Sequence, residues 1–264
     1  MPEGHTIHRL ARRHNALLAR RALRLSSPQG RFASDAAALD GRVLDRVRPY
    51  GKHLFYEFGP DVVHVHLGIY GVFEEHERPF PAPRGAVRLR MATDDVLVDL
   101  RGPTVCERIG RAERDAILDR LGPDPLDPKA DRERLWRKVS RRDTPIAALL
   151  LDQSAIAGIG NVYRAEALYV LGIDPHRPAR TLTREEFDAL WDTLARMLRT
   201  GVRLGRIVTT EPADRDRRGG RPSDADRHYL WRRTDLPCRR CGTPVRSGDL
   251  GARTIYWCPE CQRG

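Results

Sequence analysis

Residues 152–161, with the sequence DQSAIAGIGN, separate two stretches that have the apolar spacing of helices, Pro145 to Leu151 and Val162 to Leu171. The glycines at positions 158 and 160 permit tight turns where a helix cannot continue. Backbone N–H groups at such a turn and at the following helix start can bind a phosphate, and Asn161 adds a side-chain donor. A plain helical hairpin with a glycine-rich turn is the structural alternative. Either way, the segment predicts a helical second half of the chain.

Two more helices are expected in this half, over Asp131 to Val139 and Arg184 to Leu198. Thr144 and Thr183 have side chains that are preferred at helix N-caps, and the proline after Thr144 suits the first helical position. Before these helices, residues 122–128 contain four Gly and Pro residues in seven positions, which indicates a linker.

Two Cys-x-x-Cys pairs lie close to the C-terminus. Cys238 and Cys241 are separated from Cys258 and Cys261 by 16 residues, which is the spacing of a four-thiolate zinc site on a small β-hairpin. Disulfides are the alternative, and the absence of an export signal disfavours them. Because four thiolates leave no ligand position for water, we expect one structural Zn²⁺. Cys106 stands apart and is expected to be a small buried side chain.

The first half has the pattern of a β structure that follows one helix, Thr6 to Leu18. Five runs have strand composition and are bounded by Gly, Pro and Asp: Val43 to Val47, His53 to Phe58, Val62 to Phe73, Ala86 to Met91 and Val96 to Leu100. In the third run, Val63 and Val65 alternate with His64 and His66, so one face is buried and the other offers histidines. We therefore predict a β-sandwich or barrel preceded by a helix.

These patterns together predict an α+β protein of two main domains. We place an N-terminal β-sandwich domain at residues 1–121 and a linker at 122–130. A helical domain follows at 131–228, and a C-terminal zinc-finger hairpin occupies 229–264. Within the helical domain, Thr209 to Asp226 is rich in Gly, Pro, Arg and Asp, and we expect it to be a mobile loop.

The charge balance restricts the kind of partner. Lys and Arg number 47 and Asp and Glu 36, which gives a net charge of +11 and favours a polyanion such as nucleic acid. No run of about 20 apolar residues is present, and no apolar segment follows a basic N-terminal region. We therefore expect an intracellular, soluble protein that has no membrane partner.

The chain begins Met1-Pro2-Glu3-Gly4. Removal of Met1 would leave Pro2 with a free secondary amine, and an α-amino group with a pKa near 8 is about ten per cent neutral at pH 7. A neutral amine can attack an electrophilic sugar carbon, and the iminium formed by proline has no N–H to lose. Glu3 is placed to donate a proton and to take one back. The same residues also begin many chains in which they have no catalytic role.

Two further cations occupy turns. Lys52 lies in the sequence PYGKHLF, at the entrance to an apolar strand, where it could bind a phosphate. Arg253 lies in the sequence GART between the cysteine pairs, at the expected tip of the zinc-finger hairpin. In each case the alternative is an exposed, solvated side chain.

Four pieces occur together in a specific order: Pro2-Glu3-Gly4, then Gly51-Lys52 before a strand, then LLLDQ followed by GIGN at residues 149–161, and then the finger with GART and WCPECQ. This ordered set resembles the bacterial Fpg/Nei (formamidopyrimidine-DNA glycosylase/endonuclease VIII) family over essentially the whole chain, and it is most similar to the actinobacterial Nei branch. The resemblance implies that Pro2 is the Schiff-base nucleophile at C1′ and Glu3 the proton donor. It assigns Lys52 to DNA contact and β-elimination, and Arg253 to δ-elimination.

The same resemblance implies the DNA contacts. Asn161 and Arg120 would bind backbone phosphates, and Ile69 and Tyr70 match the position of the side chains that fill the void left by an extruded nucleotide. As a structural alternative, Ile69 and Tyr70 are ordinary strand residues.

The chain also departs from the family pattern. His5 and Thr6 replace the usual second Pro and Glu, which puts in doubt any role of a second carboxylate. Ala147 stands where the Fpg branch often has Lys, and Gly68 where the Nei branch can carry a polar void-filling residue. The position of Ala147 favours the Nei branch and thus oxidised pyrimidines.

The predicted function is a bifunctional DNA glycosylase/AP lyase of base excision repair that excises oxidised bases, mainly pyrimidines, and nicks the strand by β,δ-elimination. We expect a monomer in the cytoplasm, close to the nucleoid, that acts on damaged double-stranded DNA without a small-molecule cofactor. The alternatives are a purine-directed Fpg-type enzyme, a member that is an AP lyase only, and a catalytically silent DNA-binding protein.

Overall fold

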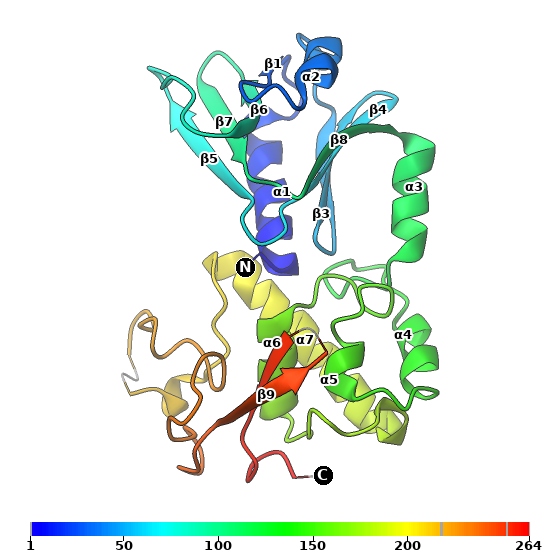
Figure 1. The fold of residues 1–264 in the computed structure, drawn as a ribbon, viewed down its shortest axis with the longest axis vertical. Coiled ribbons are helices and arrows are strands. Elements are labelled where there is room, and N and C mark those ends of the chain that lie inside the picture. The colour runs from blue at the N-terminus through cyan, green and yellow to red at the C-terminus, as the bar shows by residue number, and fades with distance from the viewer. Residues whose placement is uncertain (1, 217–218, 252, 264) are drawn as a thin grey trace. The chain divides into compact units, whose positions relative to one another are not determined.

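A computed structural model describes residues 2–216, 219–251 and 253–263. Met1, whose removal is predicted, and Ala252, in the predicted hairpin turn, lie outside the described residues. The chain forms two compact units, which divide between Arg120 and Leu121 (Figure 1). The finer predicted division, with a linker at 122–130 and a boundary at 228, stays a prediction.

The N-terminal unit contains two antiparallel four-stranded sheets and three helices. The first sheet has the order β1-β6-β7-β5, and the second has the order β2-β3-β4-β8. The helices are α1 (Gly4–Leu18), α2 (Ala33–Leu39) and α3 (Arg111–Arg120). The strands are β1 (Arg24–Ser26), β2 (Arg46–Tyr50), β3 (His53–Phe58), β4 (Asp61–His66), β5 (Val72–Glu77), β6 (Val87–Ala92), β7 (Val96–Arg101) and β8 (Val105–Gly110). The predicted β structure with a leading helix is confirmed.

The core of this unit joins both sheets to the apolar face of α1 (Figure 1). Ile7 of α1, Tyr56 of β3 and Leu100 of β7 are all almost completely buried in it. Along β4, Val63 and Val65 enter the same core, as their spacing of two residues predicts. The helix that follows the N-terminus is therefore fixed by apolar packing.

One predicted strand is wrong. The run from Val62 to Phe73 does not form a single strand, because β4 ends at His66 and β5 begins at Val72. Gly68, between them, has a φ of +65°, a left-handed conformation that a strand cannot contain. A Cβ on Gly71 would lie 2.4 Å from the carbonyl oxygen of Leu67, so the loop closes too tightly for any side chain there. The elements β1, β8, α2 and α3 were not predicted from the sequence.

The C-terminal unit is helical and ends in a hairpin. Its helices are α4 (Arg132–Val139), α5 (Ile146–Leu149), α6 (Asn161–Val170) and α7 (Arg184–Leu204), with short 3₁₀ helices η1 (Ala179–Thr181) and η2 (Pro212–Asp214). The strands β9 (Arg246–Leu250) and β10 (Arg253–Trp257) pair antiparallel. Among the described residues, no helix is both long enough and apolar enough to cross a membrane.

The helix N-caps test two of the helix starts that the sequence predicts. Thr183 caps α7, and a reciprocal bond from the side chain of Glu186 completes a capping box, as the sequence predicts. Thr144 does not cap α5. Pro145 is the N-cap residue and the helix is a single turn, whereas the carbonyl of Thr144 accepts the backbone N–H of Ala179 at 3.0 Å. The prediction of a helix from Pro145 to Leu151 is therefore wrong in its bounds.

Candidate functional site

The N-terminal candidates lie at the start of α1. Pro2 is half-buried, and Glu3 is the N-cap residue, with an extended backbone and a fully buried side chain. The backbone carbonyl of Glu3 accepts the N–H of Thr6 at 2.9 Å, whereas its carboxylate makes no capping hydrogen bond. Because Ile7 anchors the first turn in the core, the position of both candidates is set by a rigid helix.

The two residues that depart from the family pattern contact each other. The hydroxyl of Thr6 lies 3.2 Å from Nε2 of His5, whose side chain is buried. Burial lowers the pKa of His5 to about 4, so that the ring is neutral at pH 7. The chain thus has a neutral imidazole in the turn that follows Glu3.

Lys52 lies in the two-residue turn between β2 and β3, where Tyr50 pairs with His53. Gly51, the first residue of the turn, has a φ of +55°, as a tight hairpin with glycine in that position requires. Burial lowers the pKa of His53 to about 3, and the charges of Lys52 and Arg120 contribute to the same shift. The predicted phosphate contacts Lys52 and Arg120 therefore both contribute positive charge near this ring.

Ile69 and Tyr70 lie in the loop between β4 and β5, not in a strand. Tyr70 is 84% exposed and Ile69 is 50% exposed. Beside them, a Cβ on Gly68 would lie 1.9 Å from Oγ1 of Thr104, so a side chain at position 68 would have to displace Thr104. The loop therefore presents two large apolar side chains to solvent and has no room for a third side chain at Gly68.

The two turns between α5 and α6 are closed by the side chain of Gln153. Its Nε2 donates to the carbonyls of Leu151 at 3.0 Å and Ile159 at 2.9 Å, and its Oε1 accepts the N–H of Gly158 at 3.1 Å. Gly158 has a φ of +87°, which glycine adopts without strain. The predicted alternative of a plain helical hairpin does not fit a segment with two turns held in this way.

Asn161, the first residue of α6, is joined to the finger hairpin. Its Nδ2 donates to the carbonyl of Thr254 at 2.9 Å, and Nη2 of Arg164 lies 3.4 Å from the same oxygen. Arg164 is completely buried, and its Nη1 donates to the carbonyl of Ala147 at 2.9 Å. Arg253, which precedes Thr254, is exposed at the start of β10. Asn161 is therefore bonded to the residue that directly follows Arg253 in the chain.

Glu166, two residues after Arg164 in α6, is also completely buried. Its carboxylate accepts the backbone N–H groups of Tyr229 and Leu230, both at 2.8 Å, and of Trp231 at 2.9 Å. The hydroxyl of Thr209 donates to it as well. These bonds satisfy a buried charge with four donors and hold the segment that leads to the finger.

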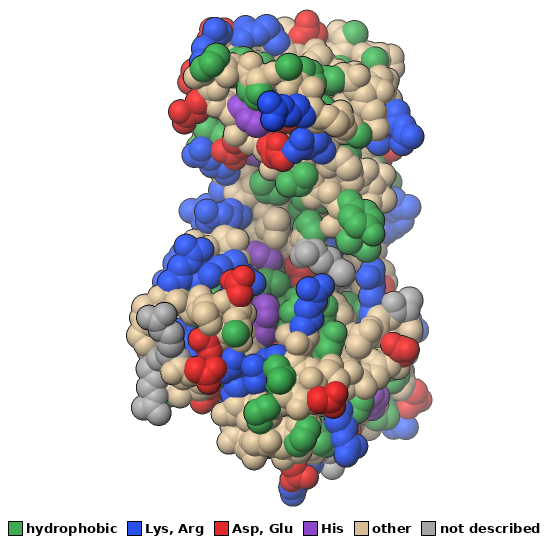
Figure 2. All heavy atoms as spheres, turned by 60° about the vertical axis from the view of Figure 1, so that its left-hand side comes forward, with side chains coloured by type: hydrophobic (Ala, Val, Ile, Leu, Met, Phe, Trp, Pro, Cys, Tyr) green, Lys and Arg blue, Asp and Glu red, His purple; other side chains and the backbone are tan. Residues whose placement is uncertain are grey.

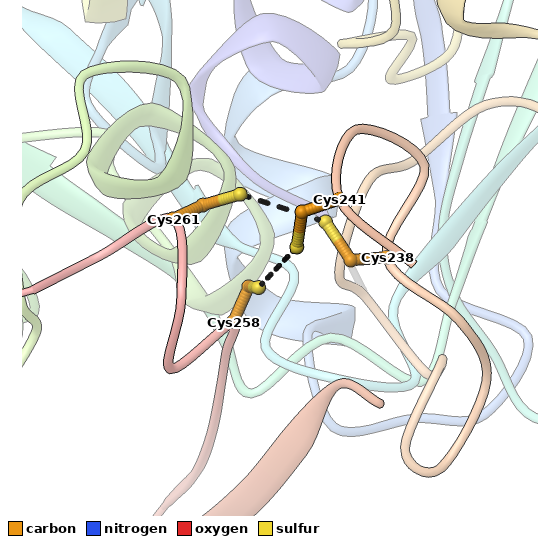
Figure 3. Close-up of side chains that lie close together, drawn as sticks. All are labelled: Cys238, Cys241, Cys258 and Cys261. Atoms are coloured by element: carbon orange, nitrogen blue, oxygen red, sulfur yellow. Dashed lines mark hydrogen bonds between the residues drawn. The ribbon is translucent and has the colours of Figure 1, made fainter. Parts of the chain in front are cut away.

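The four cysteines form one cluster (Figure 3). Cys238 and Cys241 come from the loop before β9, and Cys258 and Cys261 from the loop after β10, with all four Sγ atoms within 4.8 Å of one another. The Sγ atoms of Cys241 and Cys258 are 3.5 Å apart, and those of Cys238 and Cys261 are 3.8 Å apart. These distances exclude disulfides, whose sulfur atoms lie about 2 Å apart. They fit a tetrahedral zinc ion, because Zn–S bonds of about 2.3 Å put sulfurs about 3.8 Å apart.

Cys106 lies outside this cluster, on β8. It is half-buried against the core of the N-terminal unit, and burial raises the pKa of its thiol to about 12. A thiol that holds its proton so firmly is a poor nucleophile and a poor metal ligand.

The surface carries the positive charge that the composition predicts. On the face drawn in Figure 2, Lys and Arg side chains form several patches on each of the two units. A surface of this kind attracts polyanions through long-range electrostatics.

Comparisons with known proteins decide the family. The model of the formamidopyrimidine-DNA glycosylase N-terminal domain matches residues 1–106, and that of the formamidopyrimidine-DNA glycosylase H2TH domain matches residues 121–212. The protein named endonuclease 8 1 from Mycobacterium tuberculosis is 48% identical over 270 aligned residues, which cover 99% of this chain and all of the relative. The chain belongs to the Fpg/Nei family.

Further members of the Fpg/Nei family agree with the predicted branch and fold. Probable endonuclease 8 2 of Streptomyces coelicolor is 37% identical, with 100% of this chain and 95% of the relative covered, which supports the actinobacterial Nei branch. The crystal structure of the MutM (Fpg) protein from Thermus thermophilus has a TM-score of 0.79 at 30% identity, over 99% of this chain and 98% of that one. Lactococcus lactis Fpg, in a complex with abasic-site DNA, has a TM-score of 0.83 at 19% identity, over 99% and 100% of the two chains.

Arg164 and Glu166 were not singled out from the sequence. Both are charged residues in a helix, NVYRAEALYV, in which almost every other side chain is apolar. A charge that interrupts an apolar helix indicates a buried partner, and that signal was available. The partners themselves, Thr254 and residues 229–231, are too distant in the sequence for any local pattern to identify them.

Proposed function

We propose that this member of the Fpg/Nei family is a bifunctional DNA glycosylase and AP lyase of base excision repair. The observation that carries the proposal is Pro2, half-buried, directly before a fully buried Glu3 at the start of an anchored helix. A nucleophile and a proton donor on adjacent residues of a rigid element are what a covalent glycosylase needs.

In the proposed reaction, the amine of Pro2 forms a bond to C1′ of the damaged nucleotide while the glycosidic bond breaks. The departing base takes a proton that Glu3 supplies. The C1′–O4′ bond of the sugar then breaks, O4′ takes up a proton, and an iminium forms between Pro2 and C1′. This iminium makes the C2′ proton acidic, and loss of that proton expels the 3′ phosphate in β-elimination. A second elimination then expels the 5′ phosphate. We assign Lys52 to the phosphate beside the reacting sugar and to β-elimination, and Arg253 to δ-elimination.

The DNA contacts follow the predicted assignments, with one refinement. Arg120 binds a backbone phosphate, as does the start of α6 at Asn161. Since one amide hydrogen of Asn161 already serves the carbonyl of Thr254, its second amide hydrogen makes the phosphate contact. Ile69 and Tyr70 enter the duplex where the nucleotide has been extruded, a role for which exposed apolar side chains on a tight loop are suited.

The proposed metal is one structural Zn²⁺ held by Cys238, Cys241, Cys258 and Cys261. Bound there, zinc would tie the two loops together and so fix the hairpin that carries Arg253. The donor set has no open ligand position, so we assign the metal no part in the chemistry. We further propose that the protein is a monomer in the cytoplasm, associated with the nucleoid where its DNA substrate lies.

We propose oxidised pyrimidines as the main lesions, on the basis of the endonuclease 8 relatives and of Ala147. The purine-directed alternative and the lyase-only alternative are tested by duplexes that carry thymine glycol, 8-oxoguanine or a bare abasic site. Faster excision of thymine glycol is expected. Faster excision of 8-oxoguanine would overturn the lesion preference and leave the mechanism intact.

Borohydride trapping on an abasic-site duplex tests the mechanism itself. Borohydride reduces the iminium to a stable link, so wild-type protein lacking Met1 is expected to cross-link, and peptide mapping should place the DNA on the N-terminal peptide. Pro2→Gly should lose most of the cross-link. An extension of one residue before Pro2 should abolish it, because an amide nitrogen does not attack, and the same extension at the C-terminus is the control.

The outcome also decides between the enzyme and the silent DNA-binding protein. If processed wild-type protein binds abasic-site DNA and yields no cross-link, the enzymatic proposal fails. A cross-link that maps to Lys52 would instead move the nucleophile to that residue.

A further inference from the structure

A side-chain hydroxyl of helix α6 reaches the cysteine cluster. Tyr169 lies near the C-terminal end of α6, and its side chain is almost completely buried. Its hydroxyl oxygen lies 3.0 Å from Sγ of Cys238, the first cysteine of the cluster. The two residues are 69 positions apart in the sequence, so the fold of the C-terminal unit creates this contact.

The state of the sulfur decides which atom donates in this contact. Zinc binds cysteine as the thiolate, which has no hydrogen to give. A tyrosine hydroxyl holds its proton at pH 7. With the metal bound, Tyr169 is therefore the donor and the sulfur of Cys238 is the acceptor. A hydrogen bond to a charged acceptor is shorter and stronger than one between neutral groups.

The charge of the cluster gives this bond its value. Four thiolates carry more negative charge than one Zn²⁺ neutralises, and the sulfurs of Cys238 and Cys258 have little access to water because both residues are buried. Excess charge in a buried site is costly unless protein groups take the place of water as hydrogen-bond donors. The hydroxyl of Tyr169 is such a group.

The ring of Tyr169 is held in place by a second tyrosine and by an arginine. Its centroid lies 4.8 Å from that of Tyr229, and the guanidinium of Arg240 lies 5.2 Å from the centroid of Tyr169 and 5.0 Å from that of Tyr229. Arg240 belongs to the same Cys-x-x-Cys pair as Cys238. A cation over an aromatic face is attracted to the ring. It also withdraws electron density from the phenol, which makes the hydroxyl a better donor.

We propose that Tyr169 is a positioning residue for the zinc site, whose hydroxyl donates to the thiolate of Cys238 and strengthens the binding of the metal. The inference rests on the proposed zinc site and not on the proposed reaction. It also gives helix α6 two roles, because the helix begins at Asn161, the proposed phosphate contact, and bonds to a metal ligand near its other end.

Absorption spectroscopy of the full-length protein with Co²⁺ in place of zinc tests the hydrogen bond. Sulfur-to-cobalt charge transfer gives a band in the near ultraviolet, and d–d bands in the visible report the tetrahedral geometry. A hydrogen bond removes electron density from the sulfur, so its loss in Tyr169→Phe should move the charge-transfer band to longer wavelength. The d–d bands should stay in place, because the ring that packs against Tyr229 is retained.

Two spectroscopic outcomes would contradict the proposal. A charge-transfer band at the same wavelength in wild type and Tyr169→Phe would mean that the hydroxyl does not donate to the thiolate. Shifted d–d bands would mean that Tyr169 shapes the site by packing instead of by its hydrogen bond.

Competition with a zinc chelator measures the consequence for the metal. Loss of a group that bonds to a metal ligand commonly weakens metal binding by 10- to 100-fold, so Tyr169→Phe should hold zinc about tenfold less tightly than wild type. Tyr256→Phe is the matched control, because it removes a hydroxyl from a tyrosine of β10 whose ring packs on Trp231. It should change neither the affinity nor the spectrum. Equal zinc affinity in Tyr169→Phe and wild type would overturn the proposal.

The proposals fail in different ways. Wild-type protein that binds neither zinc nor cobalt refutes the zinc site and the role of Tyr169 with it, whereas borohydride trapping still decides the reaction. Wild-type protein that binds the metal, with a Tyr169→Phe variant that matches it in spectrum and affinity, refutes the role of Tyr169 alone.

Discussion

The N-terminal unit is stabilised by one apolar core shared between two sheets and a helix, whereas the finger region has a small cluster around Tyr169, Tyr229 and Val245 that includes cysteines. The finger has other interactions instead: the hydrogen bonds of the Glu166 carboxylate and the Asn161 amide, and the cluster of four cysteines that we propose to bind zinc. An apolar core loses stability gradually as side chains are trimmed, but a region held by a few ligands depends on each one. The two regions should therefore respond very differently to single substitutions.

The largest effect is expected for Cys241→Ser. Loss of one of four ligands should release zinc, increase hydrogen exchange in the finger and weaken binding to abasic-site DNA by at least roughly tenfold. Hydrogen exchange in the N-terminal unit should not change. Zinc content, exchange and affinity are the measurements, and Cys106→Ser is the control. Full zinc content in the variant would show that the four cysteines do not hold the finger together by binding zinc.

Glu166→Ala should have the next largest effect. The substitution leaves three backbone N–H groups without their acceptor and removes one of the two acceptors of the Thr209 hydroxyl, at a cost of about 3–5 kcal/mol. Exchange at Tyr229 to Trp231 should rise, while Glu185→Ala, on the exposed first turn of α7, should change little. Protection of residues 229–231 that survives the substitution would mean that zinc alone fixes this segment.

Low pH should lower the free energy of unfolding mainly in the N-terminal unit. Burial lowers the pKa of His14 to about 3, below the value near 6.5 of an unfolded chain, so between these values the unfolded state binds the extra proton. The contribution of His14 to stability is therefore constant above pH 6.5 and falls by about 1.4 kcal/mol per pH unit below it. Urea unfolding from pH 7 to 4.5 measures this slope.

Two variants sharpen the acid experiment. His14→Gln, which can still bond the hydroxyl of Tyr56, should reduce the slope, and His176→Gln, at the surface of the other unit, should not. A slope that is the same in wild type and His14→Gln would show that other groups cause the acid sensitivity.

Tyr70→Ala should have the smallest effect on stability. The side chain is 84% exposed, so the free energy of unfolding should change by less than about 0.5 kcal/mol. Excision of a base from duplex DNA should nevertheless slow by roughly tenfold, because Tyr70 is proposed to fill the void left in the stack. Single-turnover rates on duplex and single-stranded substrates measure the difference. Equal rates for wild type and variant on duplex DNA would show that Tyr70 does not fill the void left by the extruded nucleotide.

The fold class and the family were predictable because their signals are local. The spacing of the cysteines, the glycines at 158 and 160 and the periodicity of α7 each lie within a short window of sequence. The error at Val62 to Phe73 has a physical reason: the apolar alternation of β4 continues by chance into the loop. The left-handed Gly68 ends the strand, and no alternation count detects that conformation.

The candidate site was predictable only in part. Pro2, Glu3 and the four cysteines could be named as candidates from the sequence. The structure brings the four cysteines together, whereas the roles of Pro2 and Glu3 stay predictions. The connection of Asn161 to Thr254 could not be inferred, since these residues are 93 positions apart and only the folded unit brings them together. The hydrogen bond between His64 and Glu107 had a partial signal in the alternation of His64 and His66, but Glu107 comes from a strand that was not predicted.

The register of the finger hairpin limits how this protein can evolve. Arg253 pairs with Leu250, and the next residue places its carbonyl where Asn161 and Arg164 reach it. Substitutions in β9 and β10 leave that register intact, whereas one inserted or deleted residue in β10 would turn every later side chain to the opposite face. The length of the hairpin should therefore drift far less among descendants of this gene than its composition does.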